Sequence, residues 1–228
     1  MTNQVDDPLR PLADILKADD RQGNLPYRLE DVHAMLSAMT LHAQVPEGVG
    51  QLFETAKNIR LYTYFVYRFH QVAEMAAYQT LEMSLLLRWK KEHPEVAEDE
   101  GRKLPTLGRL LQEAAARQWI WNEGFSGRRW RAERIILDER GAEAMRTHVA
   151  GSTEPLYFSD PTPEEVEARM KAVDVVSALV KSVPQMRNTL AHGSTKLVPM
   201  SDYVLQDVCD AVNMIFQSPD ERAIHFRS

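Results

Sequence analysis

The sequence is poor in cysteine, in long apolar runs, and in glycine and proline. Its one cysteine, Cys209, excludes an intramolecular disulfide and a zinc site built from several thiolates. No segment approaches the roughly 18 apolar residues that span a bilayer, because Glu82 and Arg88 interrupt the richest run, at 81–89. Ten Gly and 12 Pro among 228 residues are too few for a collagenous or low-complexity chain.

An excess of positive charge is also missing. The 27 Lys and Arg residues are outnumbered by 33 Asp and Glu, which gives a formal net charge of −6. This excludes a protein that coats nucleic acid by bulk charge, so any RNA site has to be a local basic patch. Residues 1–10 are polar and lack the apolar core of a signal peptide. We therefore expect a cytoplasmic protein that has no membrane partner.

Apolar residues recur at the three- and four-residue spacing of helices along nearly the whole chain. This spacing predicts a helix over 27–43, and one bent helix or two helices over 46–93 with Asn58 as a plausible break. An acidic connector follows at 94–103, after which Thr106 can cap a short helix. The last predicted helix begins at Ser201.

Residues 119–160 are the least regular part of the sequence, and 134–137 give the only hint of strand-like alternation. A strong helix start follows, because Thr162 can cap, Pro163 suits a first turn and Glu165 completes a capping box. That helix is predicted to continue to Val180. We expect an all-α fold, a single domain over 1–228. It would be an up-and-down helical bundle with its core at about 46–118 and 162–217 and a peripheral insertion at about 119–160.

The segment 182–193 carries the densest set of chemically useful groups. Arg187, Asn188 and His192 place a guanidinium, a carboxamide and an imidazole within six residues. Ser182 with Gln185 resembles a capping box, so a new helical turn is predicted to start there. Glycine at 193 predicts the helix end, where the helix dipole favours a cationic His192.

The spacing of Arg187 and His192 limits how they can cooperate. Five residues along an α-helix turn the chain by roughly 140° at 3.6 residues per turn. The two side chains therefore do not share one face of a straight helix. They converge only if the helix ends between them or if two chains meet there, which favours a composite site at a dimer interface.

This segment resembles the R-x(4–6)-H signature of the HEPN superfamily, with Arg187-Asn188-x-x-x-His192 as the match, including the polar residue that often follows its arginine. The context is similar too, with an Ala/Glu-rich turn at 73–82, a Thr-Leu-Gly-x-Leu-Leu segment at 106–111, and the motif just before a final amphipathic helix. The resemblance covers about 55–118 and 162–217. It implies a HEPN-type helical bundle.

Many HEPN proteins are metal-independent endoribonucleases that act as dimers in toxin, defence and RNA-decay systems. The resemblance implies that His192 acts as the general base or acid, that Arg187 binds the phosphate, and that Asn188 orients the imidazole or holds a phosphate oxygen. It implies no metal and no cofactor. The implied partners are an RNA substrate, a second copy of the chain and a regulatory or antitoxin protein.

A noncatalytic reading stays open beside the nuclease. The Arg187 and His192 side chains can cap the last helix, fasten a dimer interface, or pair with Glu82, which we predict to support Arg187. The protein would then be a HEPN-like interaction module, or a nucleotide- or RNA-binding module, in a defence or regulatory system.

A second candidate is the basic segment 128–134, in which arginines surround a tryptophan. Such a pattern can neutralise phosphates and stack bases. The residues that would bind RNA are Arg128, Arg129, Trp130, Arg131 and Arg134. We favour the alternative of a solvated helix face, with Trp119 and Trp121 packed on the bundle, because acidic residues at 133, 138 and 139 can balance the charge.

The remaining polar candidates are predicted to be structural. His70 lies among apolar residues and is expected to form a hydrogen bond in the core, and Cys209 is expected to be an inert buried thiol. The histidines are too scattered to form a metal set. The G-x-x-x-x-G-K, G-x-G-x-x-G and G-x-S-x-G patterns are absent, which argues against P-loop, Rossmann and α/β-hydrolase enzymes.

Overall fold

A computed structural model describes residues 9–24, 28–97, 103–147, 158–193 and 199–217, and these residues form helices and connecting loops without a strand. The fold is therefore all-α, as predicted. The α-helices are α1 (Leu29–Ala38), α2 (Glu47–Tyr62), α3 (Phe69–Glu92), α4 (Pro94–Ala97), α5 (Leu107–Ala116), α6 (Arg128–Thr147), α7 (Pro163–Met170), α8 (Val175–Ala191) and α9 (Ser201–Phe216). Short 3₁₀ turns lie at Leu12–Asp14, Asp20–Asn24 and Asn122–Gly124.

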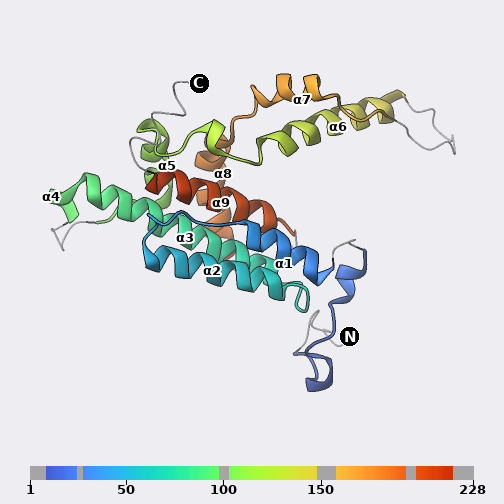
Figure 1. Cartoon of the computed structure of the whole chain (residues 1–228), viewed down its shortest axis with the longest axis horizontal. Helices are drawn as coiled ribbons and strands as arrows, with labels where there is room; N and C mark the ends of the chain where they lie inside the picture. The colour runs from blue at the N-terminus through green and yellow to red at the C-terminus, as the bar shows by residue number, and fades with distance from the viewer. Residues whose placement is uncertain (1–8, 25–27, 98–102, 148–157, 194–198, 218–228) are drawn as a thin grey trace.

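The long helix α3 lies at the centre of the bundle, where it contacts α2, α9, α5 and α8. Figure 1 shows α2, α3 and α9 running side by side. The cause is the apolar stripe on each helix, which recurs every three or four residues and has to be removed from water. On α9 the buried stripe consists of Val204, Leu205, Val208, Ala211, Val212 and Ile215.

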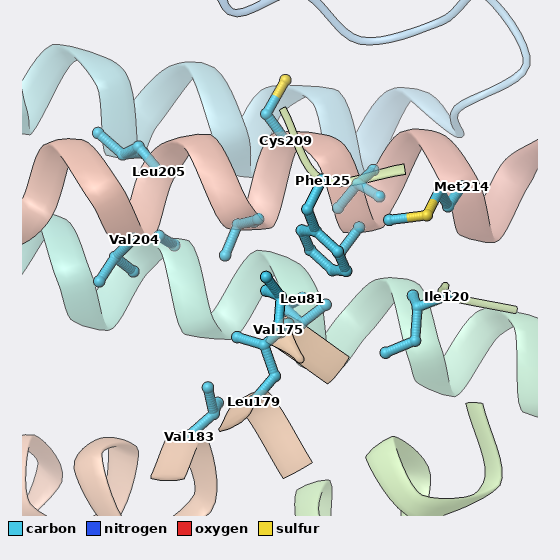
Figure 2. Packing of buried hydrophobic residues seen from close by; sticks show 14 of the residues in the cluster. Leu81, Ile120, Phe125, Val175, Leu179, Val183, Val204, Leu205, Cys209 and Met214 are labelled. Carbon is cyan, nitrogen blue, oxygen red and sulfur yellow. The ribbon is translucent and has the colours of Figure 1, made fainter. Parts of the chain in front are cut away.

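The centre of the core joins α3, α8, α9 and the loop before α6. In Figure 2, Leu81 of α3 lies next to Val175 of α8, and Phe125 lies on the other side of Leu81. Leu81 and Val175 are almost fully buried. Burial of one such side chain stabilises the fold by roughly 1.5–3 kcal/mol, so this contact fixes α8, and with it the 182–193 motif, against α3.

Helices α6 and α7 lie beside each other to one side of this bundle (Figure 1). Arg169 pairs with Glu139 at 2.6 Å, and Arg140 pairs with Glu165 at 2.5 Å, so two ion pairs join the helices. The helix α7 thus packs chiefly on α6 rather than on the bundle.

Some predicted helix bounds are wrong. Asn58 lies inside α2, where its side chain donates to the Glu54 carbonyl, and the break comes at 63–68 instead. The helix after Thr162 ends at Met170, because Asp174 caps a new helix by accepting from the Ser177 N–H at 2.9 Å. Helix α1 ends at Ala38 rather than at 43, and residues 134–137 are helical.

Other local predictions are confirmed. Thr106 accepts from the Arg109 N–H, and Thr162 and Glu165 form the full capping box. The last helix begins at Ser201, as predicted. Of the predicted connector at 94–103, residues 94–97 form α4 and 98–102 lie outside the described residues, as does most of the loop at 151–161. Within the described part of the chain, each helix is too short or too polar to cross a membrane.

Candidate functional site

The helix α8 carries the motif without a break. The capping box predicted at Ser182 is wrong, because α8 is already formed there and the Ser182 hydroxyl donates to the Ala178 carbonyl at 2.6 Å. Pro184 sits inside the helix. The helix ends as predicted, with His192 as its C-terminal cap and Gly193 at φ +87°, a backbone conformation that favours glycine.

His192 and Asn188 form an exposed pair at this helix end. Both side chains are exposed, and the His192 N–H donates to the Asn188 carbonyl at 3.0 Å. Residues four apart lie on one face of a helix, one turn from each other. The imidazole and the carboxamide can therefore contact the same ligand from solvent.

Arg187 is turned toward α3 instead. Its Nη2 lies 3.2 Å from Glu82 Oε2, and each side chain is about one third exposed, at 33% and 31%. The predicted contact between Arg187 and Glu82 is thus present. The Nε of Arg187 is buried without a hydrogen-bond partner in the described residues. The preceding residue of α8 also contacts α3, with Met186 Sδ 3.7 Å from the Tyr78 hydroxyl.

The structure therefore brings Arg187 to Glu82 and Asn188 to His192, but it does not bring Arg187 to His192 on one face. Because α8 stays helical through Ala191, the two side chains point roughly 140° apart around its axis. Of the two routes to a joint site, an early helix end is excluded. The route through two chains remains.

The arginines of the basic segment all have acceptors within this chain. The acceptors are the Met170 carbonyl for Arg128, Glu133 and Glu167 for Arg129, Asp207 for Arg131 and Asp138 for Arg134. Trp130 stacks on Tyr203 of α9, with ring centroids 4.3 Å apart. The surrounding tryptophans, Trp119 and Trp121, are buried. Glu133 and Asp138 thus balance charge as expected, whereas Arg128 and Arg131 are largely buried rather than solvated.

A buried polar cluster at the start of α3 was only partly predicted. His70 Nδ1 lies 2.6 Å from the Ser201 hydroxyl, which confirms the expected core hydrogen bond. One turn later, burial raises the pKa of Glu74 to about 7. Arg60 of α2 pairs with Asp202 of α9 nearby. Polar residues at helical spacing within an apolar stripe were the signal for this cluster, but their partners on α9 lie too far along the chain to be paired from sequence.

The described residues offer neither a reactive thiol nor a metal site. Burial raises the pKa of Cys209 to about 12, which keeps it a neutral thiol, as expected for a core residue. No group of three His, Cys, Asp or Glu side chains in the described ranges could hold a metal ion. Comparison of the chain with family models, with curated proteins and with solved structures found no match.

Proposed function

We propose that this protein is a metal-independent endoribonuclease of the HEPN type, of the kind found in toxin and defence systems. The observation that carries the proposal is the pair of exposed side chains, His192 and Asn188, at the end of α8, with Arg187 held by Glu82 on another face of the same helix. These are the groups that the Arg187-Asn188-x-x-x-His192 resemblance assigns to RNA cleavage, and the imidazole is open to a substrate.

The chemistry needs a base and a cation. His192 takes the proton of an RNA 2′-hydroxyl, whose oxygen then bonds to the adjacent phosphorus. The bond from phosphorus to the 5′-oxygen breaks, that oxygen takes a proton from water, and His192 returns its own proton to solvent. Arg187 stabilises the negative charge that grows on the phosphate oxygens. The products carry a 2′,3′-cyclic phosphate and a 5′-hydroxyl.

Two copies of the chain complete the site in this proposal. Within one chain Arg187 and His192 face different directions around α8. A two-fold axis beside α8 would place His192 of one copy opposite Arg187 of the other, because symmetric dimers use the same patch on both subunits. A homodimer therefore has two equivalent sites.

The test is cleavage of single-stranded RNA by the purified full chain in EDTA. The wild-type protein should cut and leave 2′,3′-cyclic ends. His192→Ala should lower the rate by about 10²–10⁴, the usual worth of general acid–base catalysis. His33→Ala removes an exposed histidine of α1 and should leave the rate unchanged.

Stability measurements separate catalysis from structure. The pair of Arg187 with Glu82 is one third exposed, and such pairs contribute about 0–1 kcal/mol. Arg187→Ala should therefore stay folded and yet lose cleavage. Cleavage that survives both His192→Ala and Arg187→Ala contradicts the proposal. No cleavage by the wild type, together with unfolding of His192→Ala, favours the noncatalytic interaction module.

A further inference from the structure

A cavity of about 690 Å³ lies between the C-terminal end of α3 and the N-terminal end of α5. Its volume falls within the range of about 300–1,000 Å³ that is typical of small-molecule sites. Its wall combines Trp89 of α3 and His93, which caps the end of α3, with the segment Lys103–Pro105 and Arg109 of α5. The motif residues of α8 do not line it.

His93 is held in one orientation at the cavity wall. Its Nε2 lies 2.9 Å from Glu113 Oε1, and the second Glu113 oxygen accepts from the Trp89 indole N–H at 3.1 Å. The ring centroids of Trp89 and His93 are 4.9 Å apart. An ionised carboxylate only accepts hydrogen bonds, so Nε2 carries the proton, and Nδ1, which faces Glu95, can only accept a hydrogen bond.

The charges at the cavity favour an anion. Lys103 and Arg109 are exposed, and within the described residues neither side chain has an ion-pair or hydrogen-bond partner. Glu113 is already neutralised by Arg117, whose Nε lies 2.9 Å away. Among the described residues that line the cavity, the exposed Glu95 is the carboxylate that opposes an anion, with its Oε1 3.8 Å from His93 Nδ1. The amino-terminal end of α5 adds its positive dipole.

We propose that this cavity binds a phosphate monoester of a small organic molecule. The phosphate contacts Arg109 and Lys103, because a dianion matches a guanidinium and an ammonium. The organic part packs on Leu104, which is 48% exposed, and on Pro105. This site is separate from the proposed nuclease and does not depend on it.

Calorimetric titration of the full chain with adenosine monophosphate, inorganic phosphate and adenosine tests the proposal. Adenosine monophosphate should bind more tightly than inorganic phosphate, and adenosine, which lacks the phosphate, should bind weakest. Arg109→Ala should weaken binding of the monophosphate about tenfold or more, the usual effect of losing one charged hydrogen bond. Lys171→Ala, which removes an exposed lysine after α7, should leave the affinity for the monophosphate unchanged.

Glu95→Gln is the most discriminating variant, because it removes the opposing charge while keeping the shape of the side chain. It should strengthen binding of both anions several-fold. Three results would overturn the proposal: no binding of either anion, full binding by both Arg109→Ala and Lys103→Ala, or weaker binding by Glu95→Gln. Binding of a 5′-phosphorylated oligonucleotide without binding of the monophosphate would overturn it as well.

Discussion

Glu74 and His70 lie one helical turn apart in α3, and burial shifts their pKa values in opposite directions. Burial raises the pKa of Glu74 to about 7, while burial and the nearby Arg60 lower the pKa of His70 to about 4. In both cases the neutral form is favoured. The fold thus keeps uncharged groups where α3 meets the start of α9, and ionisation of either one weakens that contact.

The Glu74 shift predicts a pH-dependent stability difference. Between pH 4.5 and about 7 the unfolded chain loses a proton that the folded chain keeps, so stability falls as pH rises through this window. Above pH 7 the loss reaches at most about 3 kcal/mol. Glu74→Gln keeps a neutral acceptor and should gain stability over the wild type at pH 8, but little at pH 4.5.

Urea unfolding of the two proteins at both pH values measures this difference. Other titrating groups cancel in the comparison, because they are present in both proteins. An equal stability difference at pH 4.5 and pH 8 would show that Glu74 does not keep its proton in the fold.

At the scale of elements, α6 is attached to α9 by a partly buried ion pair. Arg131 Nη2 lies 2.5 Å from Asp207 Oδ2, with side chains only 21% and 12% exposed. Burial raises the pKa of Asp207 even though Arg131 opposes this shift. Arg131→Ala should therefore cost about 1–3 kcal/mol by leaving a buried carboxylate unpaired.

Arg134 on the same helix supplies the matched control. Its pair with Asp138 is exposed on both sides, so Arg134→Ala should cost about 0–0.5 kcal/mol. Denaturant midpoints of the two variants give the comparison. Equal midpoints would mean that the contact with Asp207 does not hold α6 in place.

Gly124, in the loop before α6, packs closely against Met214 of α9. A Cβ at this position would lie 2.1 Å from the buried Met214 Sδ, so Gly124→Ala should cost about 1–3 kcal/mol through overpacking. A Cβ at Gly50 in α2 meets nothing within 4 Å. Gly50→Ala should stabilise the protein by roughly 0.5–1 kcal/mol. Thermal unfolding of both variants tests the pair, and a stabilised Gly124→Ala would contradict this packing.

Sequence reasoning succeeded at helix ends whose signal is local. Thr106 and Thr162 cap helices, and Gly193 ends one, because each acts on residues within one turn of itself. It failed at Ser182, where the same pattern lies inside a helix that Asp174 had already started. A capping motif alone does not show whether a helix has already begun before it.

The same limit applies to the candidate site. The contact of Arg187 with Glu82 was predictable, because a partly buried carboxylate in a long helix needs a cation. The contact of Arg131 with Asp207 was not, because it depends on how α6 crosses α9. The cavity beside His93 was missed for the same reason, since Glu113 reaches His93 only after α5 folds against α3.

At the scale of the whole molecule, the continuous helix α8 decides how a nuclease could work. It holds Arg187 and His192 on different faces of one chain, so the proposed cleavage would combine the arginine of one copy with the histidine of another. Under this proposal a monomer would be inactive. Association would then be the step at which a regulatory protein could restrain it.

Activity of a mixed dimer tests this account most directly. His192→Ala and Arg187→Ala chains with different tags are co-expressed, and the doubly tagged complex is purified and given single-stranded RNA in EDTA. One of its two sites then contains an intact arginine and an intact histidine, so it should recover about half of the wild-type rate, while each variant alone stays inactive. Failure to form a doubly tagged complex, or a complex as inactive as the single variants, would contradict the two-copy site.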